Sequence, residues 1–553
     1  MEQGRIVIAV VLSFLVFLVY DLYFVPKDTA TQAPETTARE GNEAESKPST
    51  EPASQPVAPK PAEVPASVQE ARTMPARSFR VETPLYIADL TENGAVLFNF
   101  RLKHYRESTD SNAPLKNVLG LGQEFGAFRL FEEEDALKGL QNAVFTADST
   151  AETLEVEQGQ KTLRFEWVSE SGVRVAKTYR FSADAYTIGL DVTVRNEGVS
   201  SIRDPLGIAI YQPVGESSRQ YGFEGPIGLI NGQLEEINPK KLEKEGPVSG
   251  TVTWIGEVDR YFMRTLIPRE PVEGTMRMRI VEDKVIESRL VASGVEIGPG
   301  VEQQFEYIVF LGPKALDILG QVGHDLKKAL NFGMFDFLAK PLLWLMNQIY
   351  KVIPNYGIAI ILLTILTKII LWPLGTKSYK SMADMRRLQP LMAEIREKYK
   401  NDKKKVNEEM MGLYRTYKIN PMGGCLPMVV QIPFFFALYR MLYEAIELRH
   451  APFVGWINDL SAPDRLFRFG FSIPFMEPPY GIPVLTLVMG ATMFLQQKMT
   501  PTPGDPAQAK IMMFMPIIFT VIFINFSAGL VLYWLTNNIL SIGQQYYIQR
   551  KYA

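Results

Sequence analysis

Residues 356–374 read YGIAIILLTILTKIILWPL, a run of nineteen residues in which Lys368 alone is charged. A helix needs about 20 apolar residues to cross a bilayer, so this run has nearly the length of a membrane span. A charge at the centre of such a helix costs roughly 2.5 to 3.5 kcal/mol, and charged residues there usually face protein or a water-filled cavity. Lys368 therefore marks a candidate functional site.

A second interpretation of Lys368 stays open at this point, because a long lysine side chain can reach toward the membrane interface. Lys377 follows nine residues later, about 13 Å along a helix at the usual rise per residue. The side chain of Lys368 can cover only part of that distance. The run alone does not decide between the two interpretations.

The rest of the chain divides into polar and apolar parts. It has 553 residues, 46% of them hydrophobic, and a net charge of −3, which argues against a nucleic-acid-binding protein. Apolar runs are confined to residues 1–25 and 356–548. Cys425 is the single cysteine, so an internal disulfide is impossible.

The first 77 residues predict an anchor and a tether. Residues 1–25 hold the apolar run Ile6 to Phe24, which lacks a small-x-small cleavage pattern and is interpreted as a retained transmembrane signal anchor. Residues 26–77 are rich in Pro, Ala and Glu and poor in large apolar residues, which is typical of a disordered tether.

Residues 78–322 alternate apolar and polar side chains over many short segments, such as Val173 to Phe181 and Tyr186 to Val194. Strands of this kind every ten or so residues predict one large antiparallel β-sandwich. Its single histidine, His104, has no Cys, Asp or His at ligand spacing, so we predict no metal site. A binding site for a peptide or partner in loops of this domain stays an open alternative.

Residues 323–354 show apolar residues at steps of three and four, with Trp344 and several lysines among them. This pattern predicts an amphipathic helix lying in the membrane interface. A soluble helix packed on the sandwich is the alternative.

Residues 355–548 predict five further spans, at Tyr356–Leu374, Cys425–Tyr443, Tyr480–Leu495, Ile511–Phe526 and Gly529–Ile548. Lys and Arg concentrate in residues 375–420 and are few in residues 444–479, which places the first of these loops in the cytoplasm. Six transmembrane helices then leave both termini cytoplasmic, with a short tail at 549–553, and put the sandwich on the opposite side of the membrane.

The basic loop 375–420 repeats apolar residues at steps of three and four on both sides of Asn401-Asp402, which predicts a cytoplasmic helical hairpin. Its charges form either a solvated face near lipid head groups or a docking surface for substrate or ribosome. Unbranched methionine suits surfaces that accept many apolar partners, although it also fills helix cores. The candidate docking residues are Met382, Met385, Arg386, Arg387, Met410 and Met411.

Several motifs in order along residues 356–548 resemble the YidC/Oxa/Alb family of membrane protein insertases. They are Leu388-Gln389-Pro390, the segment NPMGGCLP from Asn420 to Pro427 with Gln431-Ile432-Pro433, Phe514-Met515-Pro516, and SAGLVLYW from Ser527 to Trp534. The anchor, tether and outer sandwich match the Gram-negative form of the family by layout.

This resemblance implies a five-helix insertase core with a hydrophilic, positively charged groove open to the cytoplasm and lipid. Lys368 occupies the place of a groove cation that is usually arginine in the family. The other implied groove residues are Thr364, Gln431, Tyr533, Trp534 and Asn525.

The implied partners are nascent membrane protein substrates, the lipid bilayer, the Sec translocon (SecYEG and SecDF) and, through cytoplasmic loops, the ribosome. The implied activity is insertion and folding of inner-membrane proteins, alone or with the translocon, without a cofactor and without enzymatic chemistry. The sequence contains no G-x-x-x-x-G-K-[ST] phosphate-binding loop. The alternative is a secondary transporter or channel that uses Lys368 as a substrate or coupling site.

Overall fold

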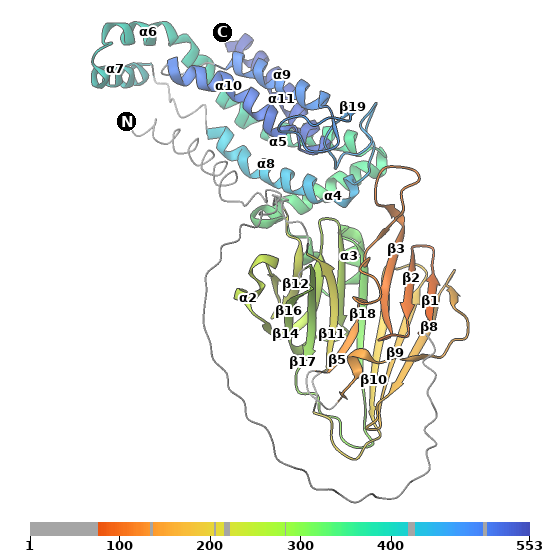
Figure 1. Cartoon of the computed structure of the whole chain (residues 1–553). Coiled ribbons are helices and arrows are strands. Elements are labelled where there is room, and N and C mark those ends of the chain that lie inside the picture. Colours follow the sequence, from red (N-terminus) through yellow and green to blue (C-terminus); the bar gives the residue numbers. More distant parts are fainter. Residues whose placement is uncertain are drawn as a thin grey trace, which may run out of the picture. The chain divides into compact units, whose positions relative to one another are not determined.

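The structure is a computed structural model that describes residues 76–132, 137–203, 206–214, 222–282, 284–417, 426–500 and 506–552. The expected anchor, nearly all of the expected tether and the motif at 420–425 lie outside the described residues. Within them, strands make up a β domain and helices make up a helical region (Figure 1).

The β domain contains two sheets. The smaller has the strand order β4-β3-β2-β1-β7, and the larger has the order β5-β11-β17-β16-β14-β15-β18-β10-β9-β8-β6, with β12 and β13 joined to it through β14. The strands are β1 Ser78–Glu82, β2 Tyr86–Thr91, β3 Val96–Arg106, β4 Leu115–Asn117, β5 Arg129–Glu132, β6 Thr146–Ala147, β7 Thr153–Glu155, β8 Gln160–Val168, β9 Val173–Ser182, β10 Thr187–Asn196, β11 Leu206–Pro213, β12 Gly225–Ile230, β13 Gln233–Glu236, β14 Val248–Val258, β15 Phe262–Pro268, β16 Val272–Val281, β17 Val285–Ala292 and β18 Glu302–Pro313.

One strand pair departs from the predicted antiparallel arrangement. β1 and β7 are parallel, with Arg80 opposite Thr153. Parallel neighbours need a long connection, and the chain between β1 and β7 passes through both sheets before it returns. An edge strand that returns from so far along the chain leaves no local signal in the sequence.

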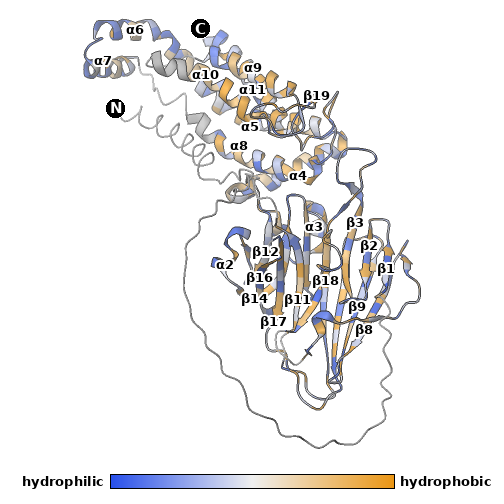
Figure 2. Ribbon diagram, in the orientation of Figure 1, coloured by the Kyte–Doolittle hydropathy of each residue, from blue (hydrophilic) through white to orange (hydrophobic). Residues whose placement is uncertain are grey.

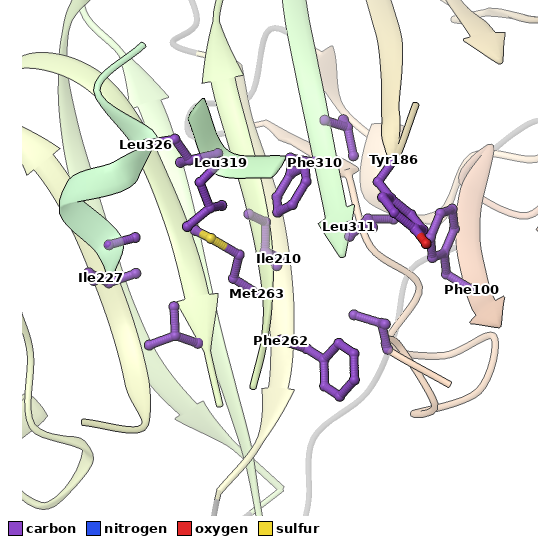
Figure 3. Close-up of a cluster of buried hydrophobic side chains, with 14 of the residues drawn as sticks. Phe100, Tyr186, Ile210, Ile227, Phe262, Met263, Phe310, Leu311, Leu319 and Leu326 are labelled. Carbon is purple, nitrogen blue, oxygen red and sulfur yellow. The ribbon is translucent and has the colours of Figure 1, made fainter. Parts of the chain in front are cut away.

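Apolar side chains from both sheets share one core. Along β9 the alternate residues Val173, Val175, Tyr179 and Phe181 are almost fully buried, as the two-residue period of a strand requires. Figure 3 shows part of this core around Phe310. Burial of this apolar face is what holds the two sheets together.

Lys177 occupies an inward position of β9 and is fully buried. Its ammonium donates hydrogen bonds to three backbone oxygens, at 3.2 Å to Gly94, 2.5 Å to Ala95 and 2.7 Å to Phe128. Buried polar groups are costly unless they are hydrogen-bonded. Lys177 therefore fastens the turn between β2 and β3 to the larger sheet.

Helix α3 Leu316–Val322 packs on the β domain, where Leu319 is buried in the core (Figures 1 and 3). The helical region contains the helices α4 Asp336–Val352, α5 Tyr356–Arg387, α6 Gln389–Lys398, α7 Lys403–Thr416, α8 Leu426–Glu444, α9 Val484–Met499, α10 Pro506–Phe523 and α11 Ala528–Tyr552. Short strands β19 Leu466–Phe469 and β20 Tyr480–Ile482 separate α8 from α9, and α2 Leu242–Glu245 lies in the β domain. Figure 2 shows hydrophobic colour along α5 and α10 and hydrophilic colour along α6 and α7.

Among the described residues, α5 is the one helix long and apolar enough to cross a membrane by length and composition, and Met512–Phe523 within α10 is a shorter apolar stretch. Residues Tyr480–Ile482, predicted to begin a span, instead pair with β19. Pro483 explains this difference, because the residue before a proline is disfavoured in a helix. The helix α9 consequently starts at Val484.

The basic hairpin consists of α6 and α7 alone. Met382, Met385, Arg386 and Arg387 belong to α5, which continues without a break past the apolar run. The helix ends there because Pro390 in the first turn of α6 disfavours a continuous helix. Of the residues 375–420 predicted to form the hairpin, 375–387 therefore belong to α5.

Within residues 323–354, α4 begins only at Asp336, after two short 3-10 turns. One face of α4 buries Leu342, Leu343 and Met346, whereas Phe337 and Trp344 are exposed. Large apolar side chains exposed on a helix are typical of an interfacial helix, which remains a prediction for this segment.

The first turn of α5 packs tightly at Gly357. A Cβ atom added there would lie 2.0 Å from Cδ2 of Phe453 and 2.4 Å from its Cγ. The backbone of Phe453 is held by hydrogen bonds to Ile457 and Asn355, so the ring has little freedom to withdraw. Glycine is therefore required at this contact.

We expect Gly357→Ala to lower the thermal unfolding temperature of the purified chain in detergent, because overpacking costs about 1 to 3 kcal/mol. Gly412→Ala is the matched control, since an added Cβ in α7 meets no atom within 4 Å and alanine favours helix. An unchanged unfolding temperature in Gly357→Ala would contradict this contact.

Candidate functional site

Polar side chains from three apolar helices meet around Lys368. The Nζ atom of Lys368 on α5 donates to Oγ of Ser541 at 2.7 Å and to Oδ1 of Asn537 at 3.3 Å, both on α11. Nε2 of Gln431 on α8 donates to the same Oδ1 atom of Asn537 at 3.3 Å. Lys368, Gln431, Asn537, Ser541 and Gln544 are called the polar seam below.

The spacing of polar residues on α11 creates this seam. Asn537, Ser541 and Gln544 follow at steps of four and three, which places them on one face of the helix. Gln544 donates through Nε2 to the backbone oxygen of Trp372 at 3.1 Å and to Oγ1 of Thr376 at 3.3 Å on α5. The seam thus continues along the contact between α5 and α11.

Each hydrogen bond around the ammonium has one donor and one available acceptor. The Ser541 hydroxyl donates to the backbone oxygen of Asn537 at 2.7 Å, so an oxygen lone pair is left to accept from Lys368. Both side-chain partners of Lys368 are neutral. The ammonium is half-buried and its charge is solvated by dipoles, which leaves it able to attract a carboxylate.

Two of the predicted groove residues, Lys368 and Gln431, meet through Asn537. Thr364 is buried, and its hydroxyl donates within its own helix to the oxygen of Ile360 at 2.6 Å. Tyr533 is also buried. In the structure, the side chains of Thr364 and Tyr533 pack between helices.

Trp534 belongs to an aromatic cluster, with ring centroids 4.8 Å from both Phe435 and Phe523. Asn525 lies apart from the seam, between α10 and α11. Its Oδ1 accepts from the backbone nitrogen of Glu477 at 2.9 Å, and its Nδ2 donates to the oxygen of Phe475 at 3.0 Å. In the structure, Asn525 thus binds the backbone of the segment before β20, and its role in the groove stays a prediction.

The candidate docking residues of the basic region occupy different surroundings. Met385 is buried and Met382 is half-buried on α5, while Arg386 and Arg387 are exposed, and Arg387 donates to the backbone oxygen of Tyr552. On α7, Met410 is half-buried and Met411 is exposed. Met411, Arg386 and Arg387 therefore have surface available to a partner.

Asn537 and Ser541 were missed by the sequence reasoning, although a signal for them exists. Polar residues at helical spacing within an apolar helix are costly in a membrane and mark contacts between helices. A second row on α11 shows the same pattern toward α9, where Asn538 donates to Thr492 and Gln549 donates to the oxygen of Met499 at 3.0 Å.

Comparisons with known proteins cover nearly the whole chain. The family model described as "60Kd inner membrane protein" matches residues 348–553, and the model described as "YidC periplasmic domain" matches residues 78–345. The "Membrane protein insertase YidC" of Syntrophobacter fumaroxidans is 40% identical over 570 residues, covering 99% of this chain and 100% of the relative. The chain belongs to the YidC family of membrane protein insertases.

Another YidC insertase, from Geobacter metallireducens, is 38% identical over 554 residues and covers 100% of this chain and 99% of the relative. A solved structure described as an active YidC insertase with its first transmembrane domain resolved is 20% identical, covers 84% of this chain and 91% of that chain, and has a TM-score of 0.37. YidC proteins are non-enzymatic insertases of the inner membrane with a periplasmic domain, and residues 78–345 match that domain.

Proposed function

We propose that the polar seam is the part of this YidC insertase that receives the hydrophilic segment of a nascent membrane protein. The observation that carries the proposal is an ammonium within the apolar helix α5 whose side-chain partners Asn537 and Ser541 are neutral. An acidic residue of a substrate gains more from Lys368 in a low-dielectric site than it does in water. The bonds to Asn537 and Ser541 hold the ammonium in place until such a residue arrives.

We further propose six membrane spans, formed by residues 1–25 and the helices α5, α8, α9, α10 and α11. The Lys- and Arg-rich helices α6 and α7 then lie in the cytoplasm with both chain termini. Residues 444–483 and the β domain lie on the periplasmic side in this topology. The exposed Arg386, Arg387 and Met411 are the proposed cytoplasmic contacts for substrate or ribosome, and the Sec translocon is the proposed partner in the membrane.

Apolar segments of the substrate leave along the lipid-facing surfaces of α5 and α11. Transfer of apolar area from water supplies roughly 25 cal/mol per Å², so insertion proceeds without a nucleotide or an ion gradient. The seam then has one task, which is to lower the cost of bringing polar residues into the bilayer.

Photocrosslinking tests this assignment. We expect a photoreactive amino acid at Gln431 to crosslink to a stalled nascent chain of a small two-span substrate, because this half-buried side chain belongs to the seam. The same probe at Leu487 on α9, which is half-exposed and outside the seam, is the control. Equal crosslinking at both positions, or none at Gln431, would count against the seam as the substrate site.

A further inference from the structure

The segment between α8 and α9 contains an apolar loop. Residues 466–475 read LFRFGFSIPF, with four phenylalanines and Arg468 as the one charged residue. This segment, called the aromatic loop here, includes β19 and precedes β20. Loops exposed to water are usually polar, so a loop of this composition indicates contact with a partner or with lipid.

Three of the four phenylalanines of the aromatic loop are exposed, and Phe469 is half-buried. Phe467 is 68% exposed, Phe471 is 64% exposed and Phe475 is 79% exposed. The rings of Phe469 and Phe471 stack with centroids 5.3 Å apart, so the apolar surface is continuous across neighbouring side chains. These exposed fractions are those of surface residues, although phenylalanine is ordinarily buried.

The backbone is strained at two of these phenylalanines. Phe467 has φ of 51° and Phe475 has φ of 63°, in the left-handed region that bulky residues rarely adopt. Such strain persists only where the surrounding structure imposes it, and it is associated with functional positions. In the aromatic loop the strained residues are the two most exposed rings.

Hydrogen bonds fasten the aromatic loop to the turn between α10 and α11. Nη1 of Arg465 donates to the oxygen of Ile524 at 2.8 Å, and Nε of Arg465 donates to the oxygen of Pro479 at 2.9 Å. Asn525 holds the other end of the loop through the backbone of Phe475 and Glu477. Both ends of the loop that carries the exposed rings are therefore held by hydrogen bonds.

We propose that the aromatic loop inserts its phenylalanines into the periplasmic leaflet of the lipid bilayer, at the boundary between head groups and acyl chains. The inference rests on the proposed six-span topology. Two observations favour lipid as the occupant. The loop is followed by β20 and then by α9, whose residues Leu487 and Val488 are half-exposed apolar side chains. The apolar surface of the loop therefore lies near the end of the proposed membrane-facing surface of α9 in the chain. Arg468 is exposed among the rings and is suited to bind a lipid phosphate.

Depth-dependent fluorescence quenching tests this proposal on the full chain in lipid nanodiscs. In a Cys425→Ser background, a fluorophore is attached to Phe471→Cys, to Ala491→Cys on the exposed side of α9, or to Val199→Cys in the β domain, where Val199 is 96% exposed. The lipids carry bromine near the head group or near the middle of the acyl chain. We expect loss of fluorescence at Phe471, stronger with the shallow bromine, and no loss at Val199.

The Ala491 probe separates this inference from the proposed function. Quenching at Ala491 with full fluorescence at Phe471 would refute lipid insertion of the loop while leaving the span intact. Absence of quenching at Ala491 would refute the proposed topology itself. Adding Phe467→Ser and Phe475→Ser to the Phe471 probe should reduce its quenching and leave quenching at Ala491 unchanged, and equal quenching in this variant would also count against insertion of the rings.

Discussion

Lys368→Glu is expected to abolish insertion of a small two-span substrate in cells depleted of their own insertase, whereas Lys368→Arg retains it. A carboxylate at this position faces Oδ1 of Asn537 and so loses a favourable hydrogen bond. It also repels the acidic residues that the ammonium attracts. At distances near 4 Å, reversing the sign of one charge changes the interaction by several kcal/mol at an effective dielectric of about 20.

Protease protection of the substrate measures this effect in cells that produce equal amounts of each variant. Lys368→Ala should fall between the other two variants, since it removes the attraction without adding repulsion. Lys351→Glu is the matched control, because Lys351 is exposed at the end of α4 and outside the seam. Full complementation by Lys368→Glu would refute the electrostatic role of the seam.

Lys368 could be found from sequence because a charge inside an apolar run is conspicuous wherever the helix packs. The apolar runs likewise predicted both ends of α8 and the first residues of α5 and α11 to within one residue. The end of α5 was not predicted, because the helix continues through polar residues from Leu374 to Arg387. The partners of Lys368 were missed, since Asn537 and Ser541 lie about 170 residues away and neutral polar residues in a helix are less conspicuous than charges.

The interior charges of the β domain were beyond prediction for a related reason. The alternation along β9 places Lys177 on the inward face. Its acceptors are backbone oxygens of Gly94, Ala95 and Phe128, which no pattern of side chains in the sequence predicts. The hydrogen bonds of Asn525 were likewise beyond prediction, because its partners Phe475 and Glu477 lie about 50 residues earlier, in a loop with no periodic signal. Family resemblance gave the layout, whereas side-chain pairing required the three-dimensional structure.

Raising the pH from about 5 to 8 is expected to destabilise the β domain through Glu257. This residue on β14 is fully buried, its Oε1 is hydrogen-bonded to the Ser288 hydroxyl and its Oε2 has no hydrogen-bond partner. Burial raises the pKa of Glu257 from 4.5 to about 8, against the smaller opposing effects of Ser288 and of the buried Arg264. The guanidinium of Arg264 donates hydrogen bonds to the backbone oxygen of Val118 and to Oε1 of Gln212.

The direction of the pH effect follows from proton binding. Between pH 4.5 and about 8 the folded state keeps the proton of Glu257 while the unfolded chain has lost it, so the free energy of unfolding falls as the pH rises. The slope approaches roughly 1.4 kcal/mol per pH unit within this window. Above pH 8 both states are ionised and the contribution of Glu257 becomes constant.

Denaturant unfolding of the full chain in detergent, followed at β-sheet wavelengths by circular dichroism, measures this slope. Glu257→Gln keeps a polar group beside Ser288 without a proton to lose, so it should flatten the decline of stability between pH 5 and 8. Glu273→Gln on β16 removes an exposed carboxylate of the same domain and should leave the slope as it is. If Glu257→Gln shows the same decline of stability with pH as the wild type, other groups carry the pH dependence. That result would refute the assigned role of Glu257.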